Sequence, residues 1–298
     1  AYPKSPLMPQ ALNWKGRILV ETGQHDVATQ VSDDLEKRYP DSPEGKNALF
    51  SMVRSALEVK QIERAIAGFQ NMLAKDYAAD EYMRLGQLFL DNAQYPQAIE
   101  GFEKVRAAVK DPTQERLLLE RSLYGLGQAY FELKQYEKSA QVLEELLQNY
   151  PNTGLFYDAK FKLGTAYREL GRLDDAEAAL SDVFRYARTP LLINRASFEL
   201  GMIQQRNPEK LQAALASFQR VELLAPRTAE LRPLIERSML EGIPLAIEIG
   251  RATDAIESCD NYMKLFPQGE HLEQVRAWKA EATLKSAGTS PAAGNDSP

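Results

Sequence analysis

Apolar positions along the chain recur at spacings of three and four residues, which is the period of one face of an α-helix. The pattern is regular at Leu123, Leu126, Tyr130 and Leu133, and it returns at Val142, Leu143, Leu146 and Leu147. A short polar break, Lys134-Gln135, separates these two segments. The pattern therefore predicts two helices joined by a tight turn, and similar blocks follow one another along most of the chain.

Two short motifs repeat with these blocks. The first begins with a small residue that is followed four positions later, in most blocks, by Phe or Leu. The small residue recurs at intervals of 33 to 41 residues, at Ala28, Ala65, Ala98, Ser139, Ala176, Ala214 and Ala255. The second motif, Leu-Gly-x-x-aromatic, precedes it in several blocks and places a Gly at 86, 127 and 164. The repetition predicts seven helical hairpins.

The recurring Gly indicates close packing. In the middle of a helix Gly costs about 1 kcal/mol relative to Ala. This cost is tolerated where a neighbouring helix passes too close for a Cβ atom. We therefore expect Gly86, Gly127 and Gly164 to lie at the closest approach of two helices, with the small residue of the second helix opposite. Proline residues that follow the second helices, such as Pro40 and Pro151, end each hairpin.

The order Leu-Gly-x-x-Tyr, Ala-x-x-x-Phe and then Pro resembles the tetratricopeptide repeat. The resemblance implies an all-α, right-handed superhelical solenoid of about seven helical hairpins over residues 9–270. Two copies depart from the pattern: the first has Ser32 where Phe is expected, and the seventh has Gly242-Ile243-Pro244 in place of Leu-Gly.

The segments on either side of the seven repeats are expected to differ from the repeats. Residues 271–285 predict a capping helix, because Leu272, Val275, Trp278 and Ala282 form one apolar stripe. Residues 286–298 are poor in core-forming side chains and are expected to be a flexible tail. Residues 1–8 include a Tyr-Pro phrase like the one at Tyr39-Pro40, so we expect them to be the end of a missing upstream repeat.

Composition narrows the function classes. The chain is 44% hydrophobic and 26% charged, which is typical of a globular protein. Lys and Arg number 36 against 42 Asp and Glu, so the net charge of −6 disfavours nucleic acid as a partner. No apolar run approaches the roughly 18 residues that span a bilayer.

Few residues are suited to catalysis. The chain has two histidines, His25 and His271, and neither has a partner three or four positions away that would form a metal-binding pair. Cys259 stands where other repeats have Phe or Leu, so we expect it to be buried and inert. We therefore predict a protein that is not an enzyme and uses no metal and no cofactor.

The resemblance also implies that the first helix of each hairpin lines a concave surface. With the recurring Gly as position 8 of each repeat, positions 5, 9, 12 and 13 of these helices predict a partner-binding groove. Its residues are Phe50, Arg54, Glu58, Met83, Gln87, Asp91, Tyr124, Gln128, Phe131, Glu132, Phe161, Arg168, Glu169 and Phe198. An apolar, aromatic-rich band thus runs beside an acidic row, although packing within the repeats accounts for the band equally well.

The acidic row is position 13, which is acidic in six of seven repeats: Glu21, Glu58, Asp91, Glu132, Glu169 and Glu248. A carboxylate near a helix C-terminus opposes the macrodipole at a cost of about 0.3–1 kcal/mol, so helix propensity does not explain the row. The row favours a protein or peptide partner with apolar anchors and Lys or Arg. The Lys and Asn with which some family members grip a terminal carboxylate are missing from positions 5 and 9.

The linkers suggest a setting. Tyr39-Pro40-Asp41-Ser42 and Tyr150-Pro151-Asn152-Thr153 resemble linkers of bacterial cell-envelope repeat proteins, such as outer-membrane assembly lipoproteins and the periplasmic partner of the Tol-Pal system. We therefore expect a non-catalytic interaction scaffold in the periplasm or cell envelope, with the cytoplasm as the alternative compartment. Two other functions stay open: a glycan-binding adaptor in polysaccharide export that uses Tyr124, Gln128 and Glu132, and the recruitment arm of a larger enzyme.

Overall fold

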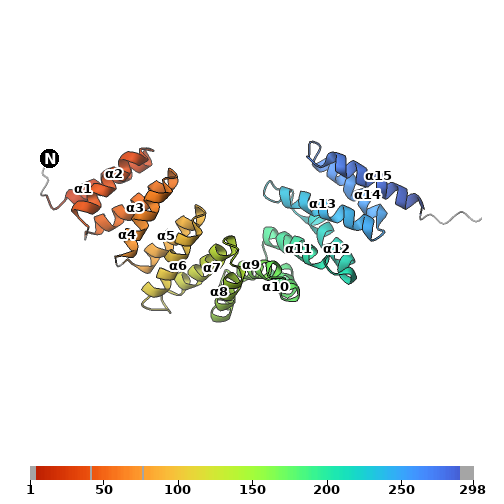
Figure 1. The fold of residues 1–298 in the computed structure, drawn as a ribbon, viewed down its shortest axis with the longest axis horizontal. Helices are drawn as coiled ribbons and strands as arrows, with labels where there is room; N and C mark the ends of the chain where they lie inside the picture. Colours follow the sequence, from red (N-terminus) through yellow and green to blue (C-terminus); the bar gives the residue numbers. More distant parts are fainter. Residues whose placement is uncertain (1–4, 41, 76, 289–298) are drawn as a thin grey trace, which may run out of the picture. The chain divides into compact units, whose positions relative to one another are not determined.

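The computed structural model describes residues 5–40, 42–75 and 77–288, and this part of the chain is helical without a strand. The helices are α1 (Met8–Glu21), α2 (His25–Arg38), α3 (Pro43–Glu58), α4 (Ile62–Leu73), α5 (Ala79–Asp91), α6 (Tyr95–Ala108), α7 (Arg116–Glu132), α8 (Tyr136–Asn149), α9 (Phe156–Glu169), α10 (Leu173–Tyr186), α11 (Pro190–Gln204), α12 (Leu211–Leu224), α13 (Arg232–Glu248), α14 (Ala252–Leu265) and α15 (Leu272–Gly288). A single 3₁₀ turn, Pro208–Lys210, precedes α12. The expected all-α solenoid of seven hairpins and a closing helix is confirmed (Figure 1).

The helices fall into two compact units, α1 to α8 and α9 to α15, which divide between Thr153 and Gly154. We refer to the odd-numbered helices α1 to α13 as A helices and to their even-numbered partners as B helices. Within each unit every A helix packs against its own B helix and against the next A helix. Among the described residues, successive B helices do not pack on one another to a comparable extent. The A helices therefore line one continuous face in each unit.

The two sequence motifs contact each other. A Cβ atom placed on Gly86 would lie 2.6 Å from the ring of Phe102, and one on Gly127 would lie 2.6 Å from the side chain of Leu143. The predicted close approach is thus confirmed. The atoms in contact with the Gly belong mainly to the apolar residue four positions after the small residue, not to the small residue itself. Both Phe102 and Leu143 are fully buried.

Two expected boundaries change, and one helix continues through a proline. The closing helix α15 extends to Gly288, three residues into the segment expected as a tail, while residues 289–298 lie outside the described residues. Helix α1 begins at Met8, one residue earlier than expected, and residues 1–4 are also outside the described part. Pro244 lies inside α13, which continues through it to Glu248.

The apolar stripe of α15 covers the last hairpin. Val275 and Ala282 are fully buried, and Leu272 and Trp278 pack against the core formed by α13 and α14. A single amphipathic helix therefore shields the end of the second unit, as a solenoid requires.

Candidate functional site

A groove crosses three A helices of the first unit. It encloses about 450 Å³ and is built from α3, α5 and α7. Its lining residues are Phe50, Arg54, Asp80, Met83, Arg84, Gln87, Leu88, Asp91, Leu118 and Arg121. We refer to it as the α5 groove, because most of these residues lie on α5.

The α5 groove brings together five of the predicted site residues, Phe50, Arg54, Met83, Gln87 and Asp91. Their spacing on the A helices explains this, because positions three and four apart share one helix face. Met83 is only 4% exposed and forms part of the floor. The groove thus has an apolar base and polar walls.

The charge of the α5 groove differs from the expected acidic trough. The guanidinium of Arg84 lies over the ring of Phe50, 5.0 Å from its centroid, and donates to Asp80 at 3.3 Å. Gln87 donates to Asp91 at 2.8 Å. Positive and negative side chains alternate across these helices, so the groove carries both charges.

Of the acidic row, Asp91 lines the α5 groove, whereas Glu58 and Glu132 are not among its lining residues. Glu58, Asp91 and Glu132 are exposed at the C-terminal ends of α3, α5 and α7. Glu58 lies 3.7 Å from Nε of Arg54 and 3.5 Å from Nδ1 of His25.

Other predicted residues lie on α7 outside the lining of the groove. Tyr124, Gln128 and Phe131 are half-buried. Phe131 packs edge-on against Tyr136, with 5.2 Å between the ring centroids. The sequence pattern placed these side chains on the correct helix, but the groove uses the preceding turns of α7 instead.

In the second unit two predicted aromatic residues belong to the core. Phe161 is 5% exposed and Phe198 only 1% exposed, so neither ring is open to a partner and this expectation is wrong. Phe198 packs in the core, with 5.8 Å between its ring centroid and that of Phe218, and an arginine of the next A helix lies over each of the two rings. The guanidinium of Arg195 lies 4.7 Å from the ring centroid of Phe161, and that of Arg237 lies 4.7 Å from that of Phe198.

Arg168 and Glu169, also predicted, form part of an ionic cluster in this unit. Arg168 contacts Glu169 at 2.5 Å and Glu199 of α11 at 3.0 Å. The side chain of Glu199 is 17% exposed. Burial raises the pKa of Glu199 above its ordinary value, while Arg168, Arg237 and Arg195 act to lower it. Arg168 is therefore occupied by two carboxylates.

The predicted groove does not include Arg121, Arg195 or Arg237, although these three arginines share a position in the repeat. Position 2 of a repeat, three residues before position 5, is Arg121, Arg195 or Arg237 in three of the seven copies. This recurrence indicates that arginines gather on the A-helix face.

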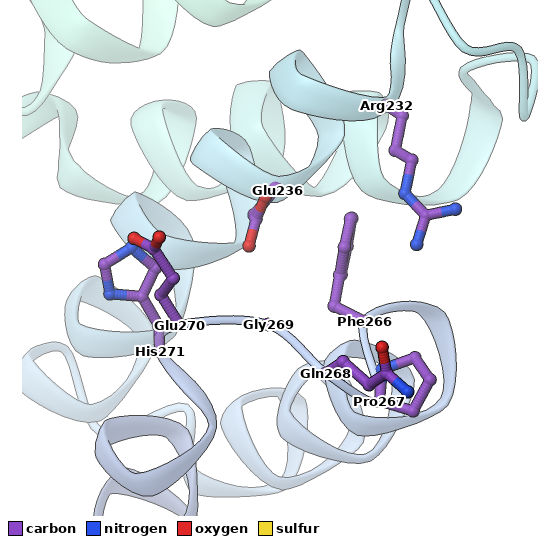
Figure 2. A pocket seen from close by; sticks show the side chains of 8 residues that line it. All are labelled: Arg232, Glu236, Phe266, Pro267, Gln268, Gly269, Glu270 and His271. Atoms are coloured by element: carbon purple, nitrogen blue, oxygen red, sulfur yellow. The ribbon is translucent and has the colours of Figure 1, made fainter.

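A second, more polar cavity of about 410 Å³ lies between α13 and the loop that joins α14 to α15 (Figure 2). Arg232 donates to the backbone oxygen of Leu265 at 2.9 Å, and Glu236 accepts from the Tyr262 hydroxyl at 2.7 Å. Glu270 and His271 line the opposite side. One sequence feature at this cavity is Pro267, which was expected to end the last hairpin.

The described residues offer little for catalysis. Within them, no three His, Cys, Asp or Glu side chains come together in a way that would hold a metal ion. Cys259 is fully buried, and burial raises the pKa of its thiol to about 11. None of the helices in this part of the chain has the length and apolar character needed to cross a membrane.

Comparison with known proteins supports the repeat assignment. Residues 121–153 and 161–229 each match a family model described as tetratricopeptide repeat. Human tetratricopeptide repeat protein 29 is 25% identical over 129 residues, which cover 43% of this chain and 26% of that protein. The match therefore spans about a quarter of that relative's length.

Two solved structures share the fold. The C-terminal part of a TPR repeat-containing protein from Cytophaga hutchinsonii matches with a TM-score of 0.63 at 13% identity, over 88% of this chain and 98% of that one. A tetratricopeptide repeat protein from Parabacteroides merdae matches with a TM-score of 0.55 at 14% identity, over 92% and 98%. At such identities the likeness concerns the fold alone.

Proposed function

We propose that the chain, whose residues 121–153 and 161–229 match tetratricopeptide-repeat models and whose fold is that of tetratricopeptide-repeat proteins, is a non-catalytic scaffold that binds a segment of a partner protein on the face formed by its A helices. The observation that carries the proposal is the α5 groove. Its apolar base and its converging polar groups are the usual composition of a site that recognises a side chain of a partner.

The groove favours an apolar anchor residue. Phe50, Met83 and Leu118, from three different helices, supply apolar surface to one cavity. Interface affinity is concentrated in a few anchors that fill such cavities. We propose that an apolar side chain of the partner enters between α3, α5 and α7.

Exposed carboxylates at the ends of the A helices add a preference for a positively charged partner. Glu58, Asp91 and Glu132 are exposed at the ends of three successive A helices. Their negative charge favours a basic side chain of the partner near these helix ends. The partner segment in the first unit thus combines an apolar anchor with Lys or Arg.

The test uses two neighbouring leucines of α7. Leu118 lines the α5 groove, whereas Leu117 is 63% exposed and lies outside it. Leu118→Asp places a charge in the groove and is expected to abolish capture of specific partners from cell lysate, as measured by quantitative mass spectrometry. Leu117→Asp, the matched control, is expected to capture the same partners as the original chain.

Circular dichroism melting must first show that both variants keep the fold. Partners that bind the Leu118→Asp variant as well as they bind the Leu117→Asp variant would exclude the groove as the binding site.

We also propose that the scaffold acts in a bacterial envelope complex, most simply in the periplasm. This rests on the Tyr-Pro linkers alone. Fractionation of the cells that express the native protein tests it, and recovery with cytoplasmic markers would contradict it.

A glycan-binding adaptor is the second candidate function. Tyr124, Gln128 and Glu132 follow one another at intervals of four along α7, on a single helix face. A glycan array probed with the full chain separates the two functions, because a protein scaffold gives no glycan-specific signal.

A further inference from the structure

The A-helix face of the second unit presents arginines that are fixed in place but not paired. Arg195 on α11 and Arg237 on α13 are both exposed. Within the described chain neither guanidinium has a carboxylate within ion-pair distance. Each instead lies over the ring of the preceding A helix, 4.7 Å from the centroids of Phe161 and Phe198 respectively.

This geometry prepares a guanidinium for binding. A ring beneath the guanidinium restricts the otherwise flexible side chain and leaves its N–H donors for another acceptor. Less side-chain entropy is then lost when an anion binds. Both rings are buried, so each arginine lies on a packed base.

The neighbouring charges decide which anion fits. Glu199 interacts electrostatically with both arginines and Asp158 with Arg195, and Glu169 and Glu199 already pair with Arg168. These carboxylates would repel a continuous polyanion such as a nucleic acid. Separate carboxylates that each reach one guanidinium avoid this repulsion and match the fork of N–H donors.

We propose that the A-helix face of the second unit binds an acidic segment of a partner protein, with one carboxylate on Arg195 and another on Arg237. The inference rests on the proposed scaffold function and names the chemistry of its partner in this unit. Adjacent packed helices lie about 8–10 Å apart. Since an extended chain advances about 3.3 Å per residue, the two acidic residues stand about three positions apart.

The test starts from an unbiased probe. Random peptides displayed on phage are selected on the immobilised full-length chain and then titrated against three forms of it. The forms are the original chain, the site variant Arg195→Gln/Arg237→Gln, and a control, Arg185→Gln/Arg188→Gln. The control removes the same charge from two exposed arginines of the same unit that lie over no ring in the structure.

The expected result is a class of selected peptides with two Asp or Glu residues about three positions apart. These peptides bind the original chain and the control equally, and they bind the site variant at least about tenfold more weakly. Their affinity falls with added salt, because exposed charges are screened. Arg195→Lys/Arg237→Lys restores part of the affinity, since Lys keeps the charge but lacks the fork.

A selection that yields no acidic class, or acidic peptides that bind the site variant equally well, overturns the inference. The Leu118→Asp variant separates this from failure of the proposed function. Peptides whose binding is lost in the Leu118→Asp variant but not in the arginine variant support the scaffold proposal and exclude the acidic site. Peptides whose binding is lost only in the arginine variant support the acidic site and exclude the α5 groove as the binding site.

Discussion

At the scale of single residues, the fold depends on contacts between small residues and bulky ones. In addition, two small residues meet directly where α5 packs on α6, because a Cβ atom on Gly101 would lie 2.9 Å from the backbone of Gly86. A backbone atom cannot rotate away as a side chain can. Glycine at 101 is therefore required by packing and not by turn geometry.

Gly101→Ala is expected to destabilise the chain by up to about 2 kcal/mol. Overpacking typically costs about 1–3 kcal/mol, and the better helix propensity of Ala offsets about 1 kcal/mol of it. Gly154→Ala is the control, because a Cβ there meets no atom within 4 Å. Urea unfolding measures both, and equal midpoints for the two variants would contradict the assigned packing.

The buried thiol gives a second prediction. Burial raises the pKa of Cys259 from 9.0 to about 11, and only the thiolate reacts readily. We expect a thiol reagent at neutral pH to leave the folded chain unmodified and to label it at once in urea. Rapid labelling of the folded chain would show that Cys259 is accessible.

The same shift has a defined effect on stability. The folded-state pKa lies above the unfolded one, so folding favours the protonated thiol. The resulting contribution to the free energy of unfolding is complete below about pH 9 and is lost as pH rises through about 11. A Cys259→Ser variant should lack this alkaline loss in a pH series of urea unfolding curves.

At the scale of elements, six of the seven hairpins share one turn geometry. In these six, the second residue after the A helix has a positive φ, at Gly23, Lys60, Ala93, Lys134, Gly171 and Gly250. Half of these positions are not glycine, which explains why the turns carry no uniform sequence signal. The sequence nevertheless predicted the helices themselves, because the apolar period of helices such as α7 and α8 is regular.

The closing helix supplies a prediction at this scale. Val275 of α15 is fully buried, whereas Leu284 of the same helix is exposed. Val275→Asp buries a charge without a partner and is expected to destabilise the chain by at least about 3 kcal/mol. Leu284→Asp is expected to change the melting temperature little. Similar melting curves for both variants would mean that α15 does not shield the core.

The candidate site was predictable only in part. Position 5 on the A helices selects Phe50 and Met83, which both line the α5 groove, because helical periodicity fixes which face they share. The same rule also selects Phe198, which is buried against Phe218 and beneath Arg237, a residue about forty positions later in the chain. Contacts of that kind follow from packing between repeats, which periodicity within one helix does not encode.

At the scale of the whole molecule, each unit has its own core and its own A-helix face. Repeat proteins gain stability from nearest-neighbour contacts, so several adjacent repeats suffice to fold. We expect residues 1–153 and 154–298, produced separately, each to be helical and to unfold cooperatively. Circular dichroism melting checks this, and a fragment without a melting transition would show that its repeats need the rest of the chain.

The central claim is that partners bind on the A helices and not on the B helices. Site-specific photo-crosslinking tests it most directly, with a photoreactive amino acid at Gln87 in the α5 groove or at Lys104, which is exposed on the B helix α6. We expect the captured partner to crosslink from position 87 and not from position 104. Crosslinks from position 104 alone would place the partner on the B helices and contradict binding on the A helices.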